Sequence, residues 1–122
     1  MARAAQGMLA AMVVLLLAFS VQAGAELTIQ ALVQNPSRYD GKVVTVVGTI
    51  TTYREYASDS GHPYTVFRLA DGDASLSVFI WNKHRFGKGD RVRVTGTFAR
   101  ARSVGAVPFD NEIQAHRIEA MP

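Results

Sequence analysis

Aromatic and cationic side chains alternate with apolar ones along two short stretches in the middle of the chain. Residues 64–70 (YTVFRLA) and 75–81 (SLSVFIW) both show the period-two alternation of β-strands. Aromatic rings stack on flat ligand rings, and guanidinium groups pair with anionic groups such as phosphates. One face of the two stretches therefore offers both kinds of contact. Its side chains are Tyr64, Val66, Arg68, Ser75, Ser77, Phe79 and Trp81.

Further aromatic and basic residues lie in three neighbouring segments, over residues 54–63, 82–89 and 99–110. These segments have the Gly, Pro, Asp and Ser content of loops. Together with the two strands they provide ten candidate ligand-binding side chains. The ten are Arg54, Tyr56, Tyr64, Arg68, Phe79, Trp81, Lys83, Arg85, Arg100 and Arg102.

Metal binding and catalysis find little support in the residue types. His62, His84 and His116 lack the spacing of metal ligands, and the chain has no cysteine. Met121 is the only methionine after the N-terminal segment, which argues against a soft-metal site. No serine lies in the glycine pattern of a nucleophile elbow. We therefore predict a protein that is not an enzyme and that holds no cofactor and no metal.

Length and charge favour one small domain. The 122 residues suffice for a single core, and 48% hydrophobic with 19% charged residues is ordinary for a globular chain. The net charge of +3 permits an anionic partner without requiring one. Because there is no cysteine, packing and backbone hydrogen bonds must hold the fold together without disulfides.

The N-terminal segment has the three parts of a secretory signal. Arg3 provides a positive start, residues 8–19 (MLAAMVVLLLAF) are apolar, and Ala23 and Ala25 fit the small residues before a cleavage site. We predict a signal peptide over residues 1–25, a periplasmic or secreted protein, and no membrane span after cleavage. The alternative is an uncleaved anchor, although the strongly apolar part is shorter than the roughly 20 residues that a bilayer requires.

A short helix precedes the strands. Residues 27–34 (LTIQALVQ) have helical spacing of apolar positions, Thr28 is a plausible N-cap, and Pro36 ends the run. We expect a helix over about 28–34, followed by a turn to Lys42. Leu32, Val33 and Tyr39 are expected to cover one end of the sheet.

Five strands are predicted between residues 43 and 120. Their apolar faces alternate, and Gly48 and Gly96 interrupt two of them at positions typical of sharp bends. Ile113, Ala115 and Ile118 break the alternation in the fifth strand, which indicates a β-bulge. The strands are expected at residues 43–53, 64–70, 75–81, 91–98 and 112–120. The predicted inward residues are Val44, Val46, Ile50, Phe67, Leu69, Leu76, Val78, Ile80, Val92, Val94 and Phe98.

Three stretches within these strands resemble the oligonucleotide/oligosaccharide-binding fold, or OB-fold. They are residues 41–48 (GKVVTVVG), 67–72 (FRLADG) and 89–96 (GDRVRVTG). The run over about residues 40–120 looks like the anticodon-binding type of OB domain, which also occurs in small exported bacterial proteins. The resemblance implies an all-β, five-stranded Greek-key barrel. Larger members have a helix between strands three and four, but residues 82–89 (NKHRFGKG) are too short for one.

The resemblance also implies where a ligand would bind. OB-folds use the outer face of strands two and three and the two loops beside it. On this chain that surface is the one with Tyr64, Phe79 and Trp81, flanked by arginines and lysines. We expect a binding module for single-stranded nucleic acid or an oligosaccharide. The alternatives are an envelope-stress or assembly factor that binds a protein partner, or a purely structural face covered by the N-terminal helix or by a second protomer.

Overall fold

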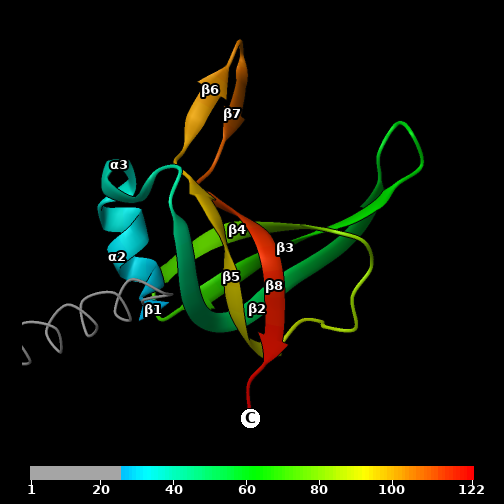
Figure 1. Cartoon of the computed structure of the whole chain (residues 1–122), viewed down its shortest axis with the longest axis horizontal. Coiled ribbons are helices and arrows are strands. Elements are labelled where there is room, and N and C mark those ends of the chain that lie inside the picture. The colour runs from blue at the N-terminus through cyan, green and yellow to red at the C-terminus, as the bar shows by residue number, and fades with distance from the viewer. Residues whose placement is uncertain (1–25) are drawn as a thin grey trace, which may run out of the picture.

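The computed structural model describes residues 26–122. The predicted signal peptide, residues 1–25, lies outside the described residues. The elements run in the order β1 (Glu26–Leu27), α2 (Ile29–Gln34), α3 (Pro36–Tyr39), β2 (Val43–Ala57), β3 (Pro63–Asp71), β4 (Ala74–Trp81), β5 (Arg91–Ala99), β6 (Arg102–Val104), β7 (Val107–Phe109) and β8 (Glu112–Ala120) (Figure 1).

Helix α2 closes one end of the sheet. The Thr28 Oγ1 caps it by accepting a hydrogen bond from the Ala31 N–H at 3.0 Å. Ile29 and Leu32 are fully buried among the strand residues. The segment after α2 was predicted to be a turn, but it contains the four-residue helix α3. Pro36 begins α3 because a proline in the first helical turn needs no hydrogen-bonding partner for its nitrogen.

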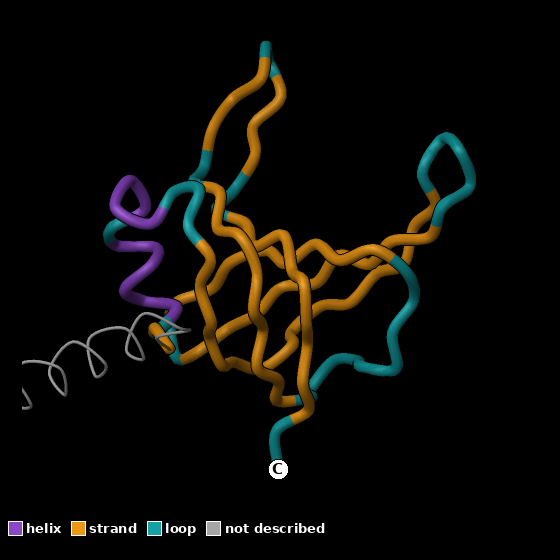
Figure 2. Tube along the Cα trace, in the orientation of Figure 1, coloured by secondary structure: helices purple, strands orange, loops and turns teal. Residues whose placement is uncertain are grey.

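Strands β2, β3, β4, β5 and β8 form a closed barrel (Figure 2). The neighbours in the sheet are β1-β2-β3-β4-β8-β5, and a β2–β5 pairing closes the ring. The β4–β8 and β1–β2 pairs are parallel, and the other pairs of the barrel are antiparallel. The closed five-stranded barrel expected from the sequence is therefore present.

The barrel interior is the hydrophobic core. Leu76 and Val78 of β4 are 1% and 0% exposed, and Ile80 is 8% exposed, as their alternation predicts. The other inward residues of the prediction are buried as well. Burial of this apolar surface, at roughly 25 cal/mol per Å², is the main stabilising contribution in a chain without disulfides.

Two glycines allow strands to approach each other closely. A Cβ on Gly48 would lie 2.8 Å from the Ala70 carbonyl oxygen, and a Cβ on Gly96 would lie 2.2 Å from the Gln114 carbonyl oxygen. Side chains at either position would push neighbouring strands apart. The predicted bulge in the fifth strand is also present, because β5 pairs with β8 on both sides of His116 but not with His116 itself.

Two predicted loops contain strand structure. Strand β2 was expected to end at Tyr53, but it pairs with β3 as far as Ala57, so Arg54 and Tyr56 are strand residues. The long loop after β5 contains the hairpin β6–β7, which turns at Gly105 with a φ of 61°. In Figure 1 this hairpin projects from the barrel.

The β4–β5 connection has no helix, as its length predicts. Phe86 packs against the core from this segment. The Tyr53 hydroxyl donates a hydrogen bond to the His84 carbonyl oxygen at 2.8 Å, which fastens the connection to β2.

Candidate ligand-binding surface

Strands β2, β3 and β4 present one continuous outer face. The antiparallel register aligns Tyr56 with Tyr64 and Tyr64 with Trp81. Side chains of directly paired residues lie on the same side of a sheet. The next pairs along the strands align Arg54, Val66 and Phe79, and the pairs after those align Thr52, Arg68 and Ser77.

Four rings in this face touch one another, and we call Tyr56, Tyr64, Phe79 and Trp81 the aromatic surface. The ring centroids of Tyr56 and Tyr64 are 5.3 Å apart and stacked. Tyr64 lies 5.3 Å from Phe79, and Phe79 lies 5.1 Å from Trp81 in an edge-to-face arrangement. The aromatic surface spans all three strands, and aromatic rings of this kind are stacking partners for flat ligand rings.

The aromatic surface is open rather than covered. The side chain of Trp81 is 51% exposed and that of Tyr56 is 44% exposed. Helix α2 directs Ile29 and Leu32 into the core, and it leaves Trp81 uncovered. His62, in the β2–β3 loop, meets the Trp81 ring edge-on at 6.4 Å. Exposed large rings in contact with one another are a feature of interaction sites.

Arg54 and Lys83 lie near the aromatic surface, and Arg85 belongs to the β4–β5 connection. Arg54, Lys83 and Arg85 are exposed, and none of them is in an ion pair within residues 26–122. Arg54 is next to Tyr56 on the same face of β2, and Lys83 lines a shallow hollow together with Tyr56. These three side chains are available to a ligand's anionic groups.

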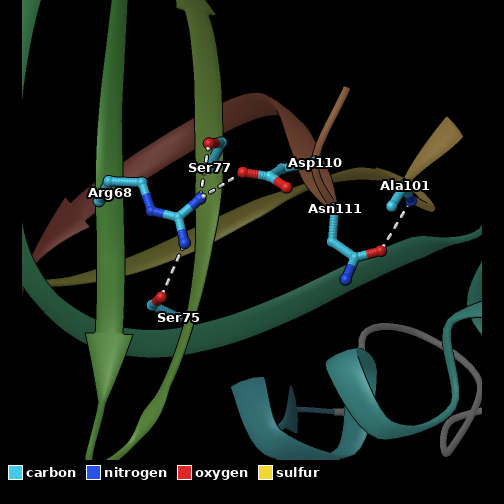
Figure 3. Close-up of polar contacts among 6 residues, drawn as sticks. All are labelled: Arg68, Ser75, Ser77, Ala101, Asp110 and Asn111. Carbon is cyan, nitrogen blue, oxygen red and sulfur yellow. Dashed lines mark hydrogen bonds and ion pairs between the residues drawn. The ribbon is translucent and has the colours of Figure 1, made fainter. Parts of the chain in front are cut away.

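Arg68 belongs to the same face, but it is held by neighbouring side chains (Figure 3). Its Nη2 donates to the Ser75 Oγ at 2.8 Å, and its Nη1 donates to the Ser77 Oγ at 3.0 Å. The Nη1 also lies 3.5 Å from the Oδ2 of Asp110, which follows β7. The positive charge of Arg68 is therefore partly offset within the protein.

Arg100 and Arg102 make their contacts elsewhere. The Arg100 Nη1 donates to the Ser37 Oγ at 3.1 Å, and its backbone N–H donates to an Asp40 carboxylate oxygen at 3.1 Å. The Arg102 guanidinium lies 5.2 Å from the centre of the Phe109 ring. Arg100 thus ties the end of β5 to α3, and Arg102 packs within the β6–β7 hairpin. These contacts do not include the aromatic surface.

The histidines are dispersed over the described residues. The His84 ring nitrogen Nε2 is 2.8 Å from the Trp81 carbonyl oxygen, and the His116 Nε2 is 3.4 Å from the Thr97 hydroxyl. Residues 26–122 contain no group of three or more histidine, aspartate or glutamate side chains placed to bind a metal ion. The same part of the chain has no helix that is long and apolar enough to cross a membrane.

Comparison with known proteins gives similarity in structure only. The chain matches no protein-family model, and it matches none of the curated proteins. A small single-stranded DNA-binding protein from Streptomyces coelicolor aligns with a TM-score of 0.54 and 20% identity, over 66% of this chain and 93% of that one. Yeast Stn1 and Ten1 align with a TM-score of 0.62 and 12% identity, over 81% of this chain and 63% of theirs.

A putative aspartyl-tRNA synthetase from Leishmania major Friedlin aligns with a TM-score of 0.59 and 14% identity. The match covers 80% of this chain but only 21% of the synthetase, which is the size of one domain. The closed barrel, its strand order and these alignments agree. The chain has an OB-fold.

The aromatic surface and the loops beside it can be located relative to the strands of an OB-fold. OB-folds in general bind ligands with the second and third barrel strands, at whose positions this chain has β3 and β4, and with two flanking loops. One of these is the β2–β3 loop and the other is the segment with the β6–β7 hairpin. The aromatic surface lies on β3, β4 and the extended part of β2.

The hydrogen bonds and the ion pair of Arg68 were not predicted from the sequence. Ser75 and Ser77 were expected on the same face as Arg68 from their alternation, but Asp110 was not among the predicted site residues. Asp110 is far from Arg68 in the chain, and no local pattern links them. The folded path of the β6–β7 hairpin brings the two side chains together.

Proposed function

We propose that this OB-fold chain is an exported, non-enzymatic binding module for single-stranded nucleic acid. The observation that carries the proposal is the aromatic surface, four partly exposed rings on three adjacent strands, each of which contacts at least one other. Base stacking on such rings contributes about 1–3 kcal/mol per base and depends little on sequence. The N-terminal pattern of residues 1–25 supports export to the periplasm or the medium.

The cations divide into two groups in this proposal. Arg54, Lys83 and Arg85 have no acidic partner among residues 26–122, so they would neutralise the phosphates of a strand stacked on Tyr56 and Trp81. Arg100 and Arg102 already have partners and would contribute little. The bound strand would follow the β2–β3–β4 face from the side of the β4–β5 connection toward Arg68.

An oligosaccharide is the second candidate ligand. Arg68, Ser75, Ser77 and Asp110 form a cluster of hydrogen-bond donors and acceptors with little net charge beside the aromatic surface. Sugar rings stack on aromatic side chains and present hydroxyl groups to such a cluster. The two ligands differ in charge, so their response to salt distinguishes them.

The test is a Trp81 fluorescence titration with oligothymidylate at several salt concentrations. Trp81 is the only tryptophan and half-exposed on the proposed site, so bound bases should quench or shift its emission. The logarithm of the binding constant should fall linearly with the logarithm of the salt concentration, with a slope of about −0.7 per phosphate neutralised. Arg54→Gln and Lys83→Gln should each reduce the slope by about that amount.

The matched control is Arg91→Gln. Arg91 is exposed and lies on β5, where it pairs with Thr49 away from the aromatic surface. It should leave the slope unchanged. No response to oligothymidylate, combined with salt-independent binding of an uncharged oligosaccharide, would favour the second candidate. A response to neither ligand in folded protein would contradict both and favour a protein partner.

A further inference from the structure

The base of the β6–β7 hairpin rests on the proposed ligand face. The Asp110 carboxylate reaches the Arg68 guanidinium at the exit of the hairpin. The next residue, Asn111, holds the two ends of the hairpin together, because its Oδ1 accepts from the Ala101 N–H at 2.8 Å (Figure 3). The Asn111 carbonyl oxygen also accepts from the Ser77 N–H at 3.1 Å.

Beyond this base, the hairpin is exposed. Every residue from 101 to 110 is exposed, including Val104 at 57% and Val107 at 55%. Arg102 and Phe109 pack on each other within the hairpin. The ion pair of Arg68 with Asp110 therefore joins an otherwise projecting element to the face on which we place the ligand.

This ion pair is weak and exposed to solvent. The side chain of Asp110 is 80% exposed, and its single contact of 3.5 Å is longer than the 2.7–2.9 Å of a strong charge-assisted hydrogen bond. Exposed pairs of this kind contribute little and weaken as salt rises. Ser75 and Ser77 hold Arg68 by separate hydrogen bonds, so the guanidinium stays oriented when the carboxylate leaves.

We propose that Asp110 is an internal competitor for Arg68, which a phosphate of the bound strand must displace. This proposal rests on the proposed function and adds a coupling to it. When a phosphate takes the Arg68 guanidinium, Asp110 is released and the hairpin loses its contact with β3. A neutral ligand has no anionic group to exchange, so it binds the aromatic surface without freeing the hairpin.

The first arm of the test needs no ligand. Asp110→Asn removes the charge and keeps the shape of the side chain. Amide relaxation measured by NMR should show larger motion of residues 102–109 in this variant than in the wild type. The matched control is Glu119→Gln, which breaks another arginine–carboxylate pair, with Arg117, on β8. The proposal is contradicted if Asp110→Asn leaves the hairpin amides unchanged, or if Glu119→Gln loosens them equally.

The second arm measures oligothymidylate binding at low salt in a double-mutant cycle. Asp110→Asn should bind about two- to fivefold more tightly than the wild type, the range that an exposed ion pair corresponds to. Arg68→Gln should remove that gain in the Asp110→Asn background, and Glu119→Gln should bind as the wild type does. Thermal unfolding of each variant checks that it is folded.

The outcomes separate the two proposals. Equal affinities of the wild type and Asp110→Asn, or a gain that survives Arg68→Gln, would refute the competitor role while leaving nucleic-acid binding intact. Absence of oligothymidylate binding in every folded variant would refute the proposed function, and with it the displacement by phosphate. Tighter binding by Asp110→Asn that depends on Arg68 supports both.

Discussion

At the scale of single residues, the aromatic surface depends on the register of three strands. Tyr56 and Tyr64 stack because β2 continues past its bulge between Ile50 and Thr52 and remains paired with β3. A shift by one residue would turn Tyr56 to the opposite side of the sheet. The rings are thus positioned by backbone pairing, and rigid positioning reduces the entropy that a ligand must overcome on binding.

Glu112 gives a prediction about stability and pH. Burial raises the pKa of its carboxyl group above the usual value of 4.5, while the Arg102 charge and a hydrogen bond with Gln114 act against this rise. A pKa that is higher in the folded state means that folding takes up a proton between the two pKa values. The protonated Glu112 carboxyl group therefore contributes fully to the free energy of unfolding below about pH 4.5, and this contribution is lost as the pH rises through the folded-state pKa.

Replacing this group with a neutral one should stabilise the protein at neutral pH. We expect Glu112→Gln to unfold at a higher temperature than the wild type at pH 7, with the difference shrinking toward pH 4. Circular dichroism melts over this pH range provide the measurement. A lower melting temperature at pH 7, or a difference that grows as the pH falls, would show that the Arg102 charge outweighs burial.

The predictability of the site also differs from residue to residue. Phe79 and Trp81 could be assigned to the outer face because they alternate with Val78 and Ile80, which are buried. Which arginines lack an acidic partner, and so remain free to bind an anionic ligand, could not be predicted from the sequence. Whether Arg68 or Arg54 has an acidic partner depends on which distant loop returns to that part of the barrel, and local sequence carries no such information.

At the scale of elements, closure of the barrel depends on close contacts at bends. Gly96 of β5 lies against the backbone of β8, where an added Cβ would be 2.6 Å from the Ala115 Cα as well as 2.2 Å from the Gln114 oxygen. Both neighbours are backbone atoms, which cannot rotate away. The β5–β8 ladder would have to shift to accept any side chain there.

Gly96→Ala should therefore lower the free energy of unfolding by about 1–3 kcal/mol, the usual cost of overpacking. Gly87→Ala is the matched control, because a Cβ at Gly87 meets nothing within 4 Å and its φ is not positive. Urea unfolding of both variants measures the difference. Equal stabilities of the two variants would mean that β5 and β8 can move apart at Gly96 with little cost in free energy.

The sequence predicted elements well where one face is buried and poorly where neither is. β4 and β5 alternate between buried and partly exposed residues, and their positions were predicted within a residue. Strands β6 and β7 are three residues each, and all six residues are exposed, so no periodic pattern marks them. The extension of β2 past Tyr53 is likewise mostly exposed, and the sequence predicts a loop there.

At the scale of the whole molecule, the large aromatic side chains are distributed unevenly over the outside of the barrel. The outer face of β2, β3 and β4 has the four rings of the aromatic surface and cations without acidic partners in the described chain. The outer face of β5 and β8 has no Phe, Tyr or Trp side chain. Of its arginines, Arg93 and Arg117 are paired with Glu26 and Glu119, whereas Arg91 has no acidic partner within residues 26–122. This asymmetry gives the barrel one surface suited to a stacked, anionic strand.

Mapping of the bound strand by NMR tests this asymmetry most directly. Oligothymidylate is added to labelled protein, and the shifts of backbone amides are followed. We predict the largest shifts at Tyr56, Tyr64, Phe79 and Trp81 and in the β4–β5 connection, with β5 and β8 nearly unchanged. Shifts concentrated on the outer face of β5 and β8, or spread evenly over the barrel, would contradict the assignment of the aromatic surface as the binding site.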